Sequence, residues 1–332
     1  IEFLGRYVSV PSDYIRTLVE HYGQNWKTPN PQHKVGQDED VDLTYKGFFP
    51  AGIPGNLYPL PIKESNIGYM LVNFIRKEET KQCIESIASN VPNMKIYVAD
   101  QDAPCGEMIE FYEKHNVEYY YMPYDCGLSV CRNFLIDKIK EPYLMWGDND
   151  FVFGNNHNIG KAITLLENKP EIGFVGGSVW VNGEMMHYER LLSYLSKYGI
   201  LIYVPLELTN PPKQTFKDIE YYYCDLTFNY VLARTKHMVD NPKLRWNPDI
   251  KVRYEHSNFF MHLLQYQDLR IAYCPAMVVI HSHSTKNDEY NKYRGRKNDG
   301  KAFADEFQLG MNFTVGAGRE VRGGAARLHR RA

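Results

Sequence analysis

The sequence predicts an α/β protein whose core is a mostly parallel β-sheet flanked by helices. From Gly68 onward, short strand-like runs alternate with amphipathic helical patterns, which is the order of repeated strand–helix units. The strand-like runs show little internal alternation of polar residues, as expected of strands that are covered on both faces. The chain has 332 residues, 44% apolar and 14% aromatic, which is enough to bury the core of one large domain.

The expected elements follow one another in a regular order. The first half predicts strand 68–74, helix 80–89, strand 94–99, helix 107–115, strand 117–122, helix 128–139 and strand 142–147. The second half predicts strands at 172–181, 227–233 and 269–280 and a helix at 255–266. Ligands of parallel sheets bind at the carboxyl ends of the strands, so functional side chains are expected directly after each strand.

Composition and charge bound the partners and the compartment. The 38 basic residues nearly balance the 40 acidic ones, so nucleic acid is not an expected partner. No run reaches about eighteen apolar residues, so no transmembrane segment is predicted in this fragment. The compartment depends on the upstream sequence: the Golgi lumen for a eukaryotic protein with an upstream anchor, the cytoplasm otherwise. The six scattered cysteines fit buried thiols or one or two disulfides.

The strongest functional feature is the segment YLMWGDNDFVF, in which an apolar strand runs directly into Asp148, Asn149 and Asp150. Closely spaced carboxylates at a strand end can bind Mg²⁺ or Mn²⁺ together with the phosphates of a substrate. The cation then stabilises charge on a departing nucleoside diphosphate. The alternative is a turn in which Asp148 and Asp150 cap local backbone groups.

Polar side chains suited to a nucleotide also follow the other predicted strands. They are Asn73, Arg76, Asp100 and Asp102. A carboxylate there can accept a hydrogen bond from a uracil N–H or a ribose hydroxyl. Arg132, in the first turns of the helix that Gly127 opens, can reach a phosphate. The alternatives are solvated loop residues and, for Arg132, an ion pair with Asp148 or Asp150.

Between Gly68 and His283, a series of segments in order resembles the inverting GT-A glycosyltransferases, most closely the ganglioside-type β-1,4-N-acetylgalactosaminyltransferases. The segments are NFIRKEE, VADQD, GLSVCRN, YLMWGDNDFVF, FVGGSVW and CDLTFNYVLART. The resemblance implies a Rossmann-like GT-A fold in a single catalytic domain, residues 67–290. The chain departs from these relatives at Asn149, where they carry a third Asp.

The same resemblance implies a set of ligands and roles. A UDP-sugar donor is expected on Arg76, Asp100 and Arg132, and Mn²⁺ (or Mg²⁺) on Asp148 and Asp150. The sugar is expected to pass to a glycan or glycoconjugate acceptor with inversion at the anomeric carbon.

An inverting transfer needs one side chain to take the proton of the acceptor hydroxyl. The segment Arg253–Phe260 resembles the acidic motif that precedes an aromatic-rich helix in these enzymes, where a Glu or Asp is the base. Glu255 is the first candidate and His256 the second, and the alternative for Glu255 is helix capping. The position before Phe-Phe, acidic in the closest relatives, is Asn258.

Further candidates lie in the second half of the chain. His281 and His283 follow the last predicted strand, where similar enzymes place a histidine as a further metal ligand; a structural role is the alternative. Asp225, Asn229 and Trp180 are candidates for contacts with the donor sugar or the acceptor, with buried hydrogen bonding or core packing as the alternatives.

The two ends of the chain differ from its middle. FLGRYVSVP and HYGQNWKTP resemble the closing segment of the LicD/fukutin-like phosphotransferases, which implies that residues 1–45 are the tail of an upstream domain; an unrelated linker is the alternative. Residues 46–66 are expected to be a proline-rich linker. Residues 291–332 are expected to be a C-terminal extension, whose Gly-, Ala- and Arg-rich last seventeen residues are predicted to be disordered.

Two other function classes share parts of this pattern. A sugar nucleotidyltransferase needs a glycine-rich loop after the first strand, where this chain has NFIRKEET. An inactive nucleotide-sugar-binding module would not need Asp148, Asp150 and Glu255 together. The sequence therefore predicts a metal-dependent inverting glycosyltransferase that moves a hexose or N-acetylhexosamine from a UDP-sugar to a glycan hydroxyl.

Overall fold

The computed structural model describes residues 2–3, 6–7, 66–103, 105–264, 269–282, 287–294 and 296–314. The chain divides into two compact units, Ile1–Ile62 and Lys63–Ala332. In the first unit, strands β1 (Glu2–Phe3) and β2 (Arg6–Tyr7) pair antiparallel. The rest of the predicted upstream tail, the linker up to residue 65 and the last seventeen residues lie outside the described residues.

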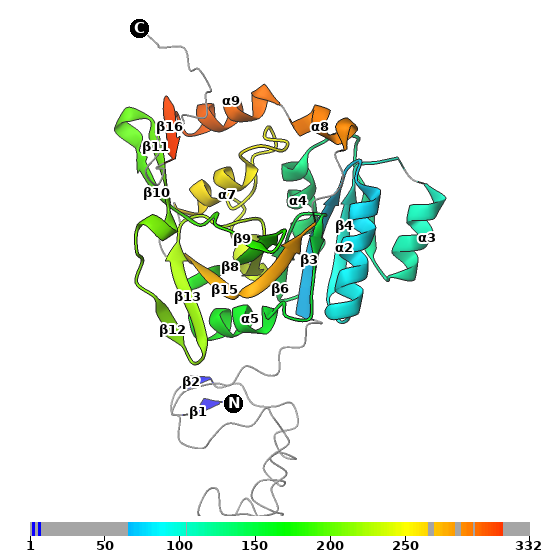
Figure 1. The fold of residues 1–332 in the computed structure, drawn as a ribbon, viewed down its shortest axis with the longest axis horizontal. Coiled ribbons are helices and arrows are strands. Elements are labelled where there is room, and N and C mark those ends of the chain that lie inside the picture. The colour runs from blue at the N-terminus through cyan, green and yellow to red at the C-terminus, as the bar shows by residue number, and fades with distance from the viewer. Residues whose placement is uncertain are drawn as a thin grey trace, which may run out of the picture. The chain divides into compact units, whose positions relative to one another are not determined.

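The second unit is built on one 11-stranded sheet, whose main path runs β12-β13-β15-β8-β14-β6-β3-β4-β5 (Figure 1). The strands are β3 (Ile67–Asn73), β4 (Lys95–Asp100), β5 (Glu118–Tyr121), β6 (Tyr143–Trp146), β7 (Phe151–Val152), β8 (Ile172–Val181), β9 (Glu184–Met186), β12 (Gln214–Phe216), β13 (Ile219–Cys224), β14 (Val231–Arg234) and β15 (Arg270–His281). β6, β3, β4 and β5 are parallel neighbours, as are β8 and β15. β14 runs antiparallel between β6 and β8. The predicted fold class, an α/β protein with a mostly parallel sheet, is confirmed.

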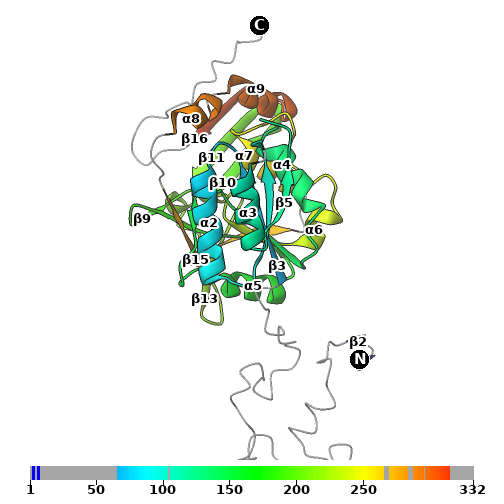
Figure 2. The same ribbon diagram turned by 90° about the vertical axis from the view of Figure 1, so that its right-hand side faces the viewer.

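Helices cover both faces of this sheet, as predicted (Figures 1 and 2). They are α2 (Lys77–Asn90), α3 (Gly106–Lys114), α4 (Leu128–Ile136), α5 (Ile159–Asn168), α6 (Thr235–Val239) and α7 (Glu255–Leu263). Two further helices, α8 (Asp288–Arg294) and α9 (Lys297–Glu306), lie at the end of the unit drawn at the top of Figure 1. Met70 and Val72 of β3 pack in one hydrophobic cluster with Leu135 of α4 and Phe259 of α7. Because side chains alternate along a strand, Tyr69 faces the other side, where it meets Cys83 of α2.

The order of the strands creates the place where a ligand can bind. From β3 the chain moves outward to β4 and β5, and it then returns to form β6 on the other side of β3. Such a reversal opens a crevice at the carboxyl ends of the two strands, which is where open α/β sheets bind ligands. Here the crevice falls between Asn73, the last residue of β3, and Asp148, which follows β6.

A smaller sheet carries the C-terminal part of the unit. β10 (Arg190–Leu195), β11 (Ile200–Pro205) and β16 (Met311–Thr314) form it, with β11 in the centre. Phe303 of α9 and Phe307 join Leu201 and Met261 in a second hydrophobic cluster. The folded unit therefore continues past the predicted domain boundary at residue 290. Among the described residues, no helix has the length and apolar character that crossing a bilayer requires.

Candidate active site

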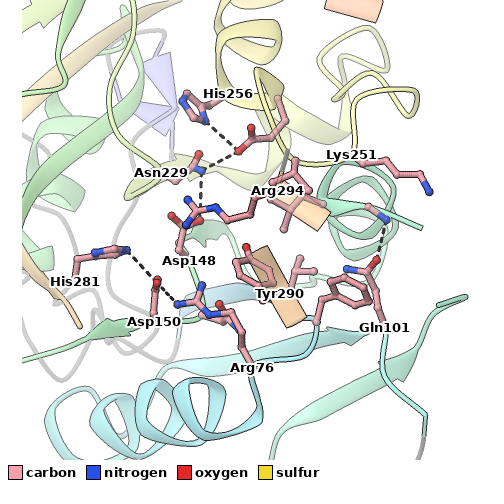
Figure 3. A pocket seen from close by; sticks show the side chains of 18 of the residues that line it. Arg76, Gln101, Asp148, Asp150, Asn229, Lys251, His256, His281, Tyr290 and Arg294 are labelled. Atoms are coloured by element: carbon pink, nitrogen blue, oxygen red, sulfur yellow. Dashed lines mark hydrogen bonds and ion pairs between the residues drawn. The ribbon is translucent and has the colours of Figure 1, made fainter. Parts of the chain in front are cut away.

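A cavity of about 510 Å³ opens at the carboxyl ends of β3 and β6. Segments from far apart in the sequence line it, including the β6–β7 turn, the start of α4, the start of α7, the end of β15 and α8 (Figure 3). The polar side chains on its wall are those of Arg76, Gln101, Asp125, Asp148, Asn149, Asp150, Tyr188, Asn229, Lys251, Glu255, His256, His281, Asn287, Tyr290, Asn291 and Arg294. Its size is in the range of small-molecule sites, about 300–1,000 Å³.

Asp150 lies between two cationic side chains. Its Oδ2 forms an ion pair with the guanidinium of Arg76 and lies 3.0 Å from Nε2 of His281 (Figure 3). Its Oδ1 is buried and has no hydrogen-bond partner among the described residues. Burial opposes ionisation, but the hydrogen bond from His281 and the charge of Arg76 outweigh it, so the pKa of Asp150 is below its usual value.

Asp148 is held more loosely than Asp150. Its Oδ1 lies 3.5 Å from Nη2 of Arg132 and 3.4 Å from Nδ2 of Asn229. Loss of hydration in the pocket, and then the charge of Asp150, raise the pKa of Asp148 to about 6. Asp148, whose contacts with Arg132 and Asn229 are long, is therefore the carboxylate more available to a further cation. The described contacts of both carboxylates are with side chains, which differs from the backbone-capping turn considered as the alternative.

Asn149, between the two, turns into the protein. Its Nδ2 donates to Oγ1 of Thr80 (3.0 Å), and that hydroxyl donates to Oδ1 of Asn73 (2.9 Å). Asn73 in turn donates to Asp100, which also accepts a hydrogen bond from the hydroxyl of Tyr112. A buried chain of polar groups thus ties the β6–β7 turn to the ends of β3 and β4. Asn149 therefore anchors the turn.

The hydrogen bonds of Asn149 allow the effect of replacing it by aspartate to be predicted. In Asn149→Asp, the new carboxylate has no proton for Thr80, whose own proton already goes to Asn73. If Thr80 turns its proton to the new carboxylate, Oδ1 of Asn73 loses its donor, and an unsatisfied buried group costs about 1–3 kcal/mol. We expect a fall of that size in the free energy of unfolding, measured by urea denaturation. Unchanged or increased stability would show that the chain of polar groups is not a constraint.

Glu255 is the first residue of α7, and one of its carboxylate oxygens accepts three hydrogen bonds. Its Oε1 accepts from Nη1 of Arg132 (3.3 Å), Nδ2 of Asn229 (3.0 Å) and Nδ1 of His256 (3.0 Å). Its Oε2 is buried and unpaired among the described residues. Arg132 and Asn229 each contact both Asp148 and Glu255, so they hold the two carboxylates in one arrangement.

The electrostatics of Glu255 and His256 are linked. Burial disfavours the charge on Glu255, but the charge and hydrogen bond of His256, with Arg132, bring its pKa to about 2. Burial likewise opposes the charge on His256, but Tyr188 and Glu255 raise its pKa to about 10. Nε2 of His256 is hydrogen-bonded to the hydroxyl of Tyr188. Glu255 is therefore ionised at neutral pH.

The structure brings most of the predicted site residues together. Arg76, Asp148, Asn149, Asp150, Asn229, Glu255, His256 and His281 line the cavity. Arg132 lies directly behind it, 1% exposed, in contact with Asp148 and Glu255. The ion pair of Arg132 with Asp148, the alternative to a phosphate contact, is present. The described hydrogen bonds of Glu255 are with side chains and not with the backbone of α7. Asn258 is not in the cavity, because its amide bonds Asn247 and Glu306.

Other predicted residues lie elsewhere. Asn73 and Asp100 are buried beneath the cavity, and both oxygens of Asp100 accept hydrogen bonds from within the protein. Asp102 accepts the backbone N–H of Ile75 and does not line the cavity. Asp225 accepts the backbone N–H of Leu192 (2.8 Å), and Trp180 is 36% exposed; neither lines the cavity. His283 is outside the described residues.

Several lining residues were not predicted. Lys251 approaches Gly127, and the backbone N–H groups at 251–253 donate to the buried carboxylate of Asp299 in α9. Tyr290 lies under the guanidinium of Arg76, 4.9 Å from ring centroid to Cζ. Arg294, on the same helix as Tyr290, also lines the cavity. Gln101 could have been predicted, because it directly follows Asp100 at the end of a predicted strand. The local sequence pattern does not indicate Lys251, Tyr290 or Arg294 as lining residues.

The arrangement of the candidate metal ligands indicates which kind of metal site they could form. The described residues contain no group of three or more His, Cys, Asp and Glu side chains arranged to hold a metal ion. A site that includes only Asp148 and Asp150 suits Mg²⁺ or Mn²⁺, since such ions accept one or two carboxylates with substrate phosphates as co-ligands. The buried, unpaired Oδ1 of Asp150 fits this role.

The fold, a mostly parallel sheet covered by helices on both faces, is of the GT-A type. Residues 70–232 match the model of glycosyl transferase family 2. The matched range begins within β3 and includes β4 to β6 and the Asp148–Asp150 turn.

Curated relatives with known names are similar over most of the folded unit. Beta-1,4 N-acetylgalactosaminyltransferase 2 of Mus musculus is 28% identical over 238 residues, which are 68% of this chain and 42% of that protein. Beta-1,4 N-acetylgalactosaminyltransferase 1 of Mus musculus is 29% identical over 225 residues, 64% of this chain and 38% of that protein. The chain thus spans about two fifths of the length of these relatives.

Solved structures with a similar fold have lower sequence identity to this chain than the curated relatives do. GalNAc-T7 with UDP, GalNAc and Mn²⁺ has a TM-score of 0.49 at 13% identity, covering 73% of this chain and 54% of that one. S. aureus TarS 1-349 in complex with UDP-GlcNAc has a TM-score of 0.48 at 12% identity, covering 67% of this chain and 59% of that one.

Proposed function

We propose that this chain transfers a hexose or N-acetylhexosamine from a UDP-sugar to a glycan hydroxyl, with a divalent cation and with inversion at the anomeric carbon. The observation that carries the proposal is the position of Asp148 and Asp150 in the cavity, at the carboxyl end of the strand next to the topological switch point. The names of the curated relatives make an N-acetylhexosamine, and UDP-GalNAc first, the donor to test.

The residues present fit a divalent cation. Asp148 and Asp150 would hold Mn²⁺ or Mg²⁺. His281, the third candidate, is hydrogen-bonded to Asp150 through Nε2, and within the described residues these three side chains do not form a metal-binding group. When bound, the cation supplies charge stabilisation for the departing diphosphate. Arg76 holds Asp150 in place, and Arg294, on the wall of the cavity, is available to a phosphate.

The proton of the acceptor hydroxyl would go to Oε2 of Glu255. Three donors fix the carboxylate through Oε1 and leave Oε2 without a partner among the described residues. A base is effective when it is fixed within hydrogen-bond reach of the proton that it takes. His256 is the second candidate, and the weaker one, because its raised pKa keeps the imidazole protonated and its Nε2 is already hydrogen-bonded to the hydroxyl of Tyr188.

A donor screen tests the proposal. UDP-, GDP- and CDP-sugars are added with Mn²⁺, and thermal stabilisation and release of the nucleotide are measured. We expect UDP-sugars alone to stabilise the protein and to be turned over, and Asp150→Ala to abolish both effects. Stabilisation by every nucleotide-sugar without turnover, with or without glycan acceptors, would favour a binding module instead.

A further inference from the structure

We propose that Cys126 and Cys131 form a thiol pair that a small-molecule disulfide, such as oxidised glutathione, converts into an intramolecular disulfide, and that this weakens binding of the nucleotide in the cavity. The second part of this inference rests on the proposed function. The first part does not.

The geometry brings the two sulfurs together. Sγ of Cys126 lies 3.4 Å from Sγ of Cys131. Cys131 is buried in α4 within the main hydrophobic cluster, and Cys126 lies in the loop before that helix and is partly exposed. None of the other four cysteines, all of them in the described part of the chain, contacts a second sulfur. A disulfide bond is about 2 Å long, so the two sulfurs must come closer by more than an ångström, and Cys126, which lies in a loop, is the residue expected to move.

The surroundings favour reaction at Cys126. The hydrogen bond from the Cys131 thiol, and then the nearby charge of Lys251, lower the pKa of the Cys126 thiol despite its partial burial. The thiolate is the reactive form of cysteine, and partial exposure lets a small disulfide reach it. Cys131, enclosed in the core, has a strongly raised pKa and is the partner that reacts second.

The chemistry is two thiol–disulfide exchanges. The Cys126 thiolate attacks one sulfur of oxidised glutathione, forming a mixed disulfide and releasing one glutathione thiolate. Cys131 then loses its proton and attacks Sγ of Cys126, which releases the second glutathione. The protein loses two hydrogen atoms, and one oxidised glutathione becomes two reduced ones.

The bond would act on the wall of the cavity. Gly127 and Leu128, which lie between the two cysteines, line the cavity, as does Asp125. The N–H of Gly127 donates to Oε1 of Gln101 (2.8 Å), and the N–H of Leu128 donates to the carbonyl of Lys251 (2.7 Å). Gly127 has φ of +100°, and a Cβ there would meet Lys251, so this segment has little room to adjust. Movement of Cys126 toward α4 is therefore expected to disturb the hydrogen bonds of Gly127 with Gln101 and of Leu128 with Lys251. Those hydrogen bonds position residues that line the cavity.

The test treats the full chain with oxidised glutathione and then counts free thiols by alkylation and maps disulfides by peptide mass spectrometry. We expect loss of two thiols and a single peptide that links Cys126 to Cys131. Cys126→Ser should keep Cys131 reduced, and Cys105→Ser, at another partly exposed cysteine, should oxidise as the wild type does. If Cys126 and Cys131 can still be alkylated after the treatment, or if Cys126 keeps a glutathione adduct, the proposed disulfide between them is wrong.

Binding of UDP with Mn²⁺, measured by calorimetry on the same samples, tests the consequence. Loss of about one hydrogen bond predicts a fall in affinity of up to about tenfold in the oxidised protein, reversed by dithiothreitol and absent in Cys126→Ser. Equal affinity of oxidised and reduced wild type would overturn this part. If reduced wild type does not bind UDP, the proposed function and the stated consequence fail together, while the disulfide is judged by the mass data alone.

Discussion

Replacing Asp150 by asparagine is expected to lower the turnover of the UDP-sugar by about 100-fold or more, because the variant loses a negative charge that holds the cation against the diphosphate. Asparagine keeps the size of the side chain, but the unpaired Oδ1 is then no longer a carboxylate oxygen. The measurement is the rate of UDP release with saturating Mn²⁺. Wild type treated with EDTA should fall to the same level, and Mn²⁺ should restore wild type only.

The variant also weakens the contacts of residue 150 with Arg76 and His281, so its folding must be checked. A thermal melt of Asp150→Asn identifies a loss of turnover that comes from unfolding. Asp218→Asn is the matched control, since Asp218 is an exposed aspartate that pairs with Lys161 outside the cavity, and its turnover should equal that of wild type. Equal turnover of Asp150→Asn and wild type, with or without EDTA, would contradict the proposal that Asp150 holds a catalytic cation.

Replacing Glu255 by glutamine is expected to lower turnover by about 10²–10⁴-fold, the usual contribution of a general base. Glutamine can still accept hydrogen bonds from Arg132, Asn229 or His256 through its one oxygen, so the first turn of α7 should persist. It cannot take the proton of the acceptor hydroxyl. Binding of UDP with Mn²⁺ should stay within a few-fold of wild type, since the loss falls on the chemical step.

His256→Gln separates the two candidate bases. If Glu255 is the base, His256→Gln should lose less turnover than Glu255→Gln. Glu110→Gln, at a position on α3 away from the cavity, serves as the matched control and should behave as wild type. Full turnover in Glu255→Gln together with a large loss in His256→Gln would assign the base to His256.

Much of this site could be predicted because it depends on strand ends. Asp148 and Asp150 directly follow an apolar strand, and parallel strands bring their carboxyl ends to one edge of the sheet. The same reasoning predicted a position for Arg76 at a strand end, and Arg76 lines the cavity. It could not decide which polar residues at those ends turn inward, because that depends on contacts such as those of Asn73 with Thr80 and Asp100.

The remainder depends on long-range packing. Tyr188 precedes β10, Lys251 lies in a loop that Asp299 of α9 fixes, and Tyr290 and Arg294 belong to α8. None of these segments has a regular hydrophobic pattern that would indicate its position. For the same reason the sequence did not show that residues beyond 290 belong to the folded unit.

The central claim is that Asp148 and Asp150 hold a divalent cation against the diphosphate of a nucleotide. Crystals grown with UDP and Mn²⁺ and measured at a wavelength where manganese scatters anomalously test it most directly. We predict one manganese peak bonded to carboxylate oxygens of Asp148 or Asp150 and to both phosphates of UDP. UDP bound in the cavity without a manganese peak there, or a peak that contacts neither aspartate, would contradict the account.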